Sequence, residues 1–131
     1  MTDYEYTYPI DIRYRDIDTQ RIVNNGVFPT YLTEARTGYF EEVLGRAAEE
    51  IQDIVTARME IDYLEPVERG DDLTVHLRCS DVGASSFTIE YEIRADGNPA
   101  ARATTVQVYI DPETGESRAI EPDVRRRFAP E

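Results

Sequence analysis

One stretch of helical periodicity, set among segments that alternate like strands, constrains the fold of this chain most. Apolar side chains recur at spacings of three and four between Val27 and Val43, which predicts one long amphipathic helix. Asn24 and Asn25 precede it as candidate N-caps, and Gly45 is a plausible end. A single helix of this kind has to bury its apolar stripe against a sheet.

Strand-like alternation fills most of the remaining chain. Apolar and polar residues alternate from Tyr4 to Tyr14. Four further strand-like runs follow the helix and are separated by short turns, at 54–64, 71–81, 86–94 and 100–110. This spacing favours a meander of neighbouring strands, followed by a short helix from Pro122 to near Phe128. The predicted class is α+β, with a curved antiparallel sheet around one central helix.

Length and hydropathy bound the organisation of the chain. Its 131 residues fit one domain, residues 1–131. No apolar run approaches the roughly 18 residues of a membrane span, and the first residues lack a signal-peptide pattern. The expected location is cytoplasmic, with no membrane partner.

The charge balance argues against nucleic acid as a partner. The formal net charge is −13, and all 14 basic residues are arginine. A phosphate backbone would be repelled by such a surface. An acidic surface without lysine resembles the surfaces of proteins from salt-accumulating halophiles, in which high ionic strength screens the repulsion between like charges.

The sequence offers little for metal binding or for a Ser-His-Asp triad. His76 is the only histidine, and it lies on the polar side of its predicted strand. The lone Cys79 alternates in phase with apolar neighbours, which predicts a core position. No metal and no bound cofactor are therefore expected.

The polar segment before the helix is the strongest candidate for chemistry. Asp16 and Asp18 stand between the end of a predicted strand and a helix N-terminus, where free backbone amides favour negative charge. Such amides can polarise a carbonyl oxygen while a carboxylate attacks or activates water. The same residues also suit a solvated turn, with Asn24 and Asn25 as simple caps.

Several segments in fixed order carry a resemblance to a known family. The segments are Ile12–Asp18, Val23–Arg36, Met59–Val67, Gly70–Leu73 and Gly83–Phe87. Together they resemble the hotdog-fold acyl-CoA thioesterases related to 4-hydroxybenzoyl-CoA thioesterase. The resemblance covers nearly the whole chain. It implies the hotdog fold and a homodimer or homotetramer, because the acyl site of that family lies between subunits.

The resemblance also assigns roles to single residues. The second aspartate of the family motif is catalytic and falls on Asp18. The backbone amide that polarises the thioester carbonyl falls at Asn25 or Gly26, within the Asn24–Gly26 motif. Candidates for contacts with coenzyme A are Arg58, Ser85 and Ser86.

Two positions depart from the family pattern. Arg21-Ile22 replaces a stretch that usually carries glycine and often histidine, so either the loop is rebuilt or the substrate differs. Phe28 replaces a frequent tyrosine, which removes a hydroxyl.

The function implied is hydrolysis of an acyl-CoA to the free acid and coenzyme A, with coenzyme A present only as part of the substrate. One alternative is an acyl-ACP thioesterase, although an acidic carrier protein would be repelled by this surface. The other is a non-catalytic module that binds an acyl thioester without cleaving it.

Overall fold

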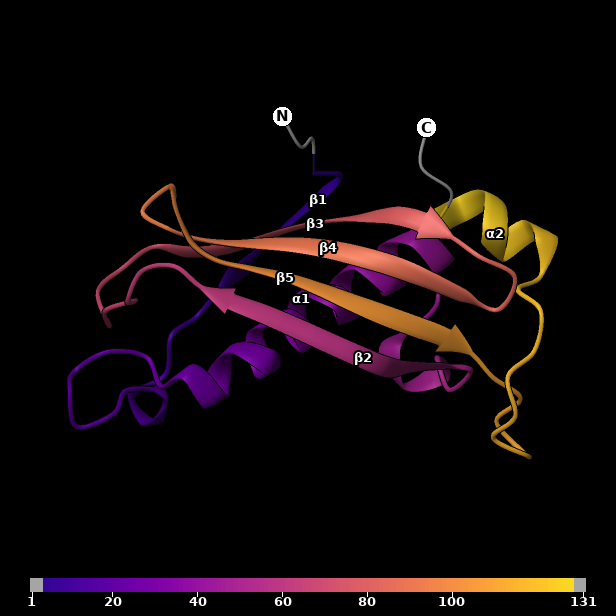
Figure 1. The fold of residues 1–131 in the computed structure, drawn as a ribbon, viewed down its shortest axis with the longest axis horizontal. Helices are drawn as coiled ribbons and strands as arrows, with labels where there is room; N and C mark the ends of the chain where they lie inside the picture. Colours follow the sequence, from indigo (N-terminus) through magenta and orange to yellow (C-terminus); the bar gives the residue numbers. More distant parts are fainter. Residues whose placement is uncertain (1–3, 129–131) are drawn as a thin grey trace.

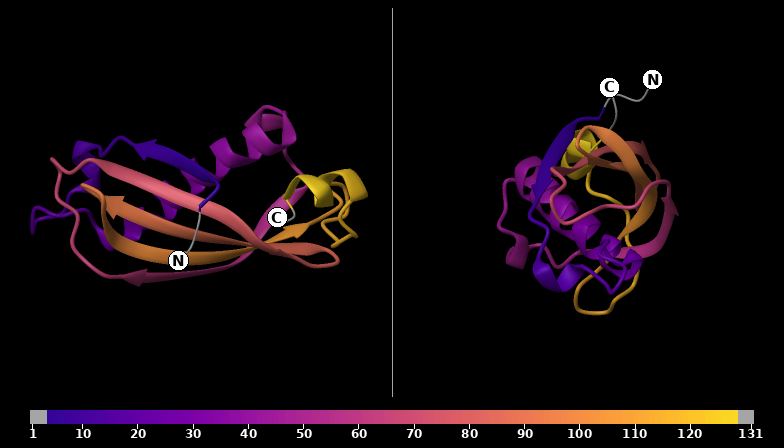
Figure 2. Two further views of the ribbon diagram at one scale, coloured as in Figure 1. Left: turned by 90° about the horizontal axis from the view of Figure 1, so that it is seen from above. Right: turned by 90° about the vertical axis from the view of Figure 1, so that its left-hand side faces the viewer.

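The alternating segments pair into a five-stranded antiparallel sheet that curves around the long helix, as the computed structural model shows for residues 4–128 (Figure 1). The elements in chain order are β1 (Tyr6–Ile10), α1 (Phe28–Leu44), β2 (Ile54–Tyr63), β3 (Leu73–Val82), β4 (Ser86–Ala95), β5 (Asn98–Tyr109) and α2 (Pro122–Phe128). Seen along the long axis, the sheet curls around one side of α1 (Figure 2). The predicted α+β class and the hotdog architecture are confirmed.

The order of strands in the sheet is β1-β3-β4-β5-β2. β3, β4 and β5 form the expected meander, but the prediction that β2 neighbours β3 is wrong. β2 pairs with β5 instead and lies at the opposite edge of the sheet from β1. Among residues 4–128 no strand pairs with the outer edge of β2. The sheet therefore ends in a ten-residue strand with unpaired backbone groups.

The first strand is shorter than its alternation predicts. β1 ends at Ile10, opposite Leu73, the first residue of β3. Tyr14, the last residue of the predicted strand, instead opens a 3-10 turn that ends at Asp16. The Asp16 carboxylate accepts a hydrogen bond from the Arg13 amide and so closes this turn. A local side-chain bond thus ends the extended backbone before the alternating pattern ends.

Helix α1 begins and ends where its sequence indicates. Pro29 lies in the first turn, and Gly45 ends the helix in the left-handed conformation, with φ of 67°. Gly38 inside the helix has a packing reason, because a Cβ at this position would lie 2.6 Å from the Tyr6 hydroxyl. The absence of a side chain there lets β1 cross close to α1.

The core fills the space between α1 and the inner face of the sheet. Along β4, alternate side chains from Phe87 to Ile93 are at most 1% exposed, as their alternation predicts. Cys79 on β3 is fully buried, which confirms its core assignment. α2 closes one end of the core, where Phe128 stacks on Phe87 at 4.6 Å between ring centroids. The N-terminal end of α1 lies at the opposite end of the core, next to the loop that precedes this helix.

Strand β2 contains a β-bulge that changes which of its residues, even-numbered or odd-numbered, face the helix. Thr56 pairs with Gln107 and Arg58 pairs with Val106, so Ala57 is an extra residue. Before the bulge, even-numbered residues such as Ile54 face the helix. After it, the odd-numbered residues 59, 61 and 63 lie opposite the inward-facing residues of β5.

Candidate active site

Asp16 ties the polar loop to helix α1. Its side chain is 4% exposed, and Oδ2 accepts from the Tyr31 hydroxyl at 2.7 Å and from the Arg13 amide at 3.0 Å. The Asp16 carbonyl accepts from the Asn24 amide at 2.9 Å. Burial, together with the bond to Asp16, raises the pKa of Tyr31, so this hydroxyl remains a donor. All these contacts fix the backbone on both sides of the loop.

The segment from Ile17 to Val23 folds back on itself as a small hairpin. Ile17 and Val23 form an antiparallel bridge, and the Asp18 amide donates to the Ile22 carbonyl at 2.9 Å. Arg21 occupies the tip with φ of 67°, the left-handed conformation that glycine adopts at little cost. The loop is thus not rebuilt to avoid this angle, and a non-glycine residue accepts a strain of about 1–2 kcal/mol.

Asp18 differs from Asp16 in both exposure and bonding. It is half-buried, and its Oδ1 accepts only a local hydrogen bond, from the Gln20 amide at 2.8 Å. Within residues 4–128, Oδ2 of Asp18 has no hydrogen-bond partner. Because the hairpin places Asp18 opposite Ile22, the carboxylate lies on the strand beside the one that leads into Asn24.

The helix start supplies one backbone amide that is not used internally. Asn24 Oδ1 accepts from the Gly26 amide at 2.7 Å, and the Val27 amide donates to the Asn24 carbonyl at 2.9 Å. These bonds form a 3-10 turn, Asn25–Val27, that continues directly into α1. In the described part of the chain the Asn25 amide has no acceptor. Asn24 is therefore the side-chain cap, and Asn25 carries the free donor.

Residues after α1 hold this turn from the other side. The Tyr63 hydroxyl, at the end of β2, donates to the Asn25 carbonyl at 2.9 Å. The Val23 amide donates to the Val67 carbonyl at 2.8 Å. Phe28 is 2% exposed and packs edge-on against Tyr63 at 5.1 Å between ring centroids. The Phe28 ring thus buries apolar surface where the family often carries a tyrosine hydroxyl.

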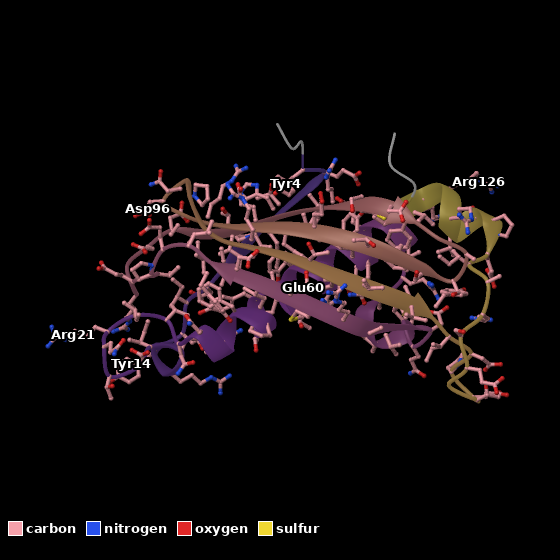
Figure 3. All side chains as sticks on the ribbon, viewed as in Figure 1. Tyr4, Tyr14, Arg21, Glu60, Asp96 and Arg126 are labelled. Atoms are coloured by element: carbon pink, nitrogen blue, oxygen red, sulfur yellow. The ribbon has the colours of Figure 1, made fainter. Side chains whose placement is uncertain are left out.

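The other sequence candidates lie away from this loop within the same chain. Arg58 lies in the middle of β2, pairs with Glu60, and has a side chain that is 67% exposed. Ser85 lies in the turn between β3 and β4, and Ser86 is the first residue of β4, at the end of the sheet next to α2 (Figure 1). The loop with Arg21 and Tyr14 projects at the opposite end of the molecule (Figure 3). One chain alone does not bring these three residues to Asp18.

His76 faces the outer side of the sheet and has its own partners there. Its ring nitrogens lie 3.0 Å from the hydroxyls of Thr7 and Thr74. Burial, followed by the nearby Arg94 charge, lowers the pKa of His76. Across residues 4–128 no three histidine, cysteine or carboxylate side chains are grouped to hold a metal ion. The search for a membrane-crossing helix in the same residues finds none that is long and apolar enough.

Two contributors to the loop were not found from the sequence. Tyr31 belongs to the helical stripe, and this spacing predicts only a core position, but its hydroxyl also donates a hydrogen bond to Asp16 at 2.7 Å. Tyr63 closes the turn from a strand 38 residues away in sequence. A tyrosine one helical turn into α1 is a weak signal by itself, whereas nothing local links Tyr63 with Asn25.

A curved antiparallel sheet around one helix, with a polar loop that feeds the helix N-terminus, defines a hotdog-fold protein. The family model of the thioesterase-like superfamily matches residues 12–128, and the chain belongs to this superfamily. A 1,4-dihydroxy-2-naphthoyl-CoA hydrolase from Synechococcus elongatus is 25% identical over 123 residues, 87% of this chain and 86% of that protein. An uncharacterised Bacillus subtilis protein, YsmA, is 26% identical over 117 residues, 88% of this chain and 80% of that protein.

Solved structures of thioesterases have a fold similar to that of this chain. A thioesterase from Thermus thermophilus, solved in complex with coenzyme A and zinc, superposes with a TM-score of 0.89 and 34% identity over 98% of this chain and 94% of that one. A predicted thioesterase from Bacillus stearothermophilus superposes with a TM-score of 0.87 and 28% identity over 94% and 92% of the two chains. The similarity thus extends over nearly the full length of both neighbours.

Proposed function

We propose that this chain hydrolyses acyl-CoA thioesters to the free acid and coenzyme A, with Asp18 as the catalytic carboxylate. The observation that carries the proposal is the state of the two aspartates in the loop. The Asp16 carboxylate accepts hydrogen bonds that hold the loop in place. Asp18 is half-buried, and in the described residues one of its carboxylate oxygens has no hydrogen-bond partner. Membership of the thioesterase-like superfamily supports the reaction type.

The chemistry needs a carboxylate and an oxyanion donor. Acting as a base, Asp18 takes a proton from water while the oxygen of that water attacks the thioester carbon. The carbon–sulfur bond breaks, and the proton passes to the departing thiolate. Acting as a nucleophile, Asp18 attacks the thioester carbon and displaces the coenzyme A thiolate to form an anhydride; water then cleaves this anhydride, which releases the free acid and restores the carboxylate. In both routes the Asn25 amide is the proposed donor to the developing oxyanion.

No resident metal or cofactor enters this proposal. A thiol-detecting assay over a panel of aliphatic and aromatic acyl-CoAs tests it. We expect release of free thiol that follows enzyme concentration and is strongly reduced in Asp18→Asn. Tight binding of an acyl-CoA analogue without thiol release from any member of the panel would instead indicate a non-catalytic binding module.

We also propose that the functional unit contains at least two chains, paired through the free edge of β2. Of the four large apolar side chains that are exposed among residues 4–128, three lie on this strand or just beyond it: Val55, Tyr63 and Leu64, at 43%, 44% and 43% exposure. An unpaired edge strand of ten residues, with exposed apolar side chains near both of its ends, is a template for a second copy.

Such a pair would complete the site. Two copies related by a twofold axis pair β2 antiparallel to itself, so the Ile54 end of one strand lies beside the Tyr63 end of the other. Tyr63 lies at the end of β2 next to the segment that carries Asp18, because its hydroxyl donates a hydrogen bond to the Asn25 carbonyl. The Ile54 end of the partner would therefore face this loop, as would the partner's turn with Ser85 and Ser86.

Light scattering in high salt tests the assembly. We expect a mass of two or four chains of 15.0 kDa. Val55→Glu should shift the mass toward one chain by placing a charge at the edge, whereas Thr7→Glu, at an exposed residue of β1 at the opposite edge of the sheet, should not. A single-chain mass for the unmodified protein would contradict the proposal.

A further inference from the structure

A cavity between α1 and the sheet has a polar wall where a packed core is expected. Its volume is about 160 Å³, and it lies at the Ile54 end of β2. Its lining residues are Arg36, Thr37, Phe40, Ile51, Ile54, Thr56 and Gln107. A cavity of about 150 Å³ in another protein holds a benzene molecule, so this volume suits a ring or a short chain better than a long alkyl group.

The wall consists of a continuous chain of hydrogen bonds. Tyr91 and Thr105 share a bond of 2.7 Å between their hydroxyls, and Gln107 Nε2 donates to Thr105 Oγ1 at 2.9 Å. Thr56 Oγ1 donates to Gln107 Oε1 at 3.0 Å. Thr105 and Gln107 are at most 1% exposed. Burying such groups costs free energy that apolar residues at the same positions would not require, so core packing does not explain them.

Arg36 completes this chain and carries its only charge. Its Nη1 donates to the Tyr91 hydroxyl at 3.2 Å, and its Nη2 donates weakly to Thr33 at 3.3 Å. Although the chain has 27 acidic residues, no carboxylate within residues 4–128 lies within 4.0 Å of the Arg36 guanidinium. A guanidinium has five donors. A half-buried cation at a cavity, bonded only to hydroxyls, therefore retains donors for an acceptor oxygen of a ligand.

We infer that this cavity receives the far end of the acyl group and that Arg36 selects acyl groups carrying an acceptor oxygen there, as a hydroxyl or a carboxylate. The inference rests on the proposed function and on the β2 pairing, which brings the Ile54 end of one chain to the Asp18 loop of the other. Arg36 acts as a specificity-determining residue, while the bond-breaking step remains at Asp18. Gln107 and Thr105 hold the Tyr91 hydroxyl against Arg36 and fix the wall.

The test uses thioether analogues of benzoyl-CoA, in which a methylene group separates sulfur from the carbonyl so that hydrolysis is blocked. Three analogues carry hydrogen, hydroxyl or carboxylate at the para position of the ring. Calorimetry on the assembled protein should show that at least one oxygenated analogue binds about tenfold or more tightly than the unsubstituted one. The hydroxyl and carboxylate arms distinguish a neutral from a charged acceptor.

Variants assign the preference to the cavity. Arg36→Met keeps the aliphatic stem and removes the donors, so the preference should fall to about twofold or less. Arg126→Met, at an exposed arginine on α2, is the matched control and should keep the preference. Equal binding of all three analogues, tighter binding of the unsubstituted one, no binding at all, or an unchanged preference in Arg36→Met would overturn the inference.

The two proposals can fail separately. Thiol release from the matched thioesters without any preference among the analogues would retain the hydrolase and remove the role of Arg36. A preference lost in Arg36→Met, without thiol release from any thioester, would retain the selective cavity and remove the hydrolase.

Discussion

Two aspartates separated by one residue show how the same chemical group serves different purposes in the two halves of one loop. Asp16 is buried and accepts two hydrogen bonds through Oδ2. Asp18 is half-buried and makes one local bond through Oδ1. A carboxylate whose lone pairs are engaged stabilises the fold, whereas one with an open oxygen remains available to a reactant. The comparison teaches that bonding state separates the two roles.

The largest expected effect is on catalysis. Asp18→Asn keeps the size of the side chain and removes its charge, so turnover should fall by about a hundredfold or more, while substrate still binds. Turnover is measured with the best acyl-CoA of the panel. Asp11→Asn, at an exposed aspartate directly after β1, serves as the control. Near-full activity of Asp18→Asn would contradict the assignment.

The next effect should fall on stability. Asp16→Asn removes the charged acceptor that Tyr31 and Arg13 share, and we expect a loss of about 1–3 kcal/mol in the free energy of unfolding. Turnover per folded molecule should change much less than in Asp18→Asn. Denaturant unfolding of Asp16→Asn, Tyr31→Phe and the double variant should give non-additive losses, because the two residues share one bond. Additive losses would show that the pair is not coupled.

A smaller loss is expected at the helix start. Asn24→Ala removes the side chain that caps Gly26 and should cost about 1 kcal/mol of unfolding free energy. Asn25→Ala should cost less, because the Asn25 side chain has no capping bond within the described residues. If Asn25→Ala were the more damaging variant, the cap and the free amide would need to be reassigned.

The smallest effect concerns the tip of the hairpin. Arg21→Gly removes the strain of a left-handed arginine but increases the freedom of the unfolded chain, so the net gain should be at most about 1 kcal/mol. Thermal unfolding of this variant beside Arg15→Gly, at an exposed arginine without positive φ, separates the two contributions. A clear loss of stability would show that the Arg21 side chain has a role of its own.

The sequence predicted those parts of the fold that local periodicity encodes. The limits of α1 and the inward residues of β4 follow from spacing, Pro29 and Gly45. The place of β2 beside β5 does not, because strand order depends on contacts between distant segments. The length of β1 was overestimated for a local reason, the side-chain bond of Asp16 that turns the backbone.

For the candidate site, too, the sequence predicted the residues that lie close together along the chain but not those that the fold brings in from a distance. Asp18 and the Asn24–Gly26 motif lie in one short segment, so a motif could identify them, although their roles remain predictions. Tyr63 enters the site only through the folded sheet. The polar cavity does have a signal in the sequence, because the inward-facing positions of β5 carry Thr105 and Gln107 where aliphatic residues are expected.

The bulge at Ala57 makes β2 sensitive to changes in length. Its single extra residue places Ile54 and Thr56 on the same side of the sheet as Met59, Ile61 and Tyr63. Loss of one residue here would turn one half of the strand outward, with Thr56 leaving Gln107 and the cavity wall opening. Replacement of the exposed Ala57 by another small residue would preserve that facing. Among related proteins, we therefore expect this position to tolerate substitutions more often than insertions or deletions.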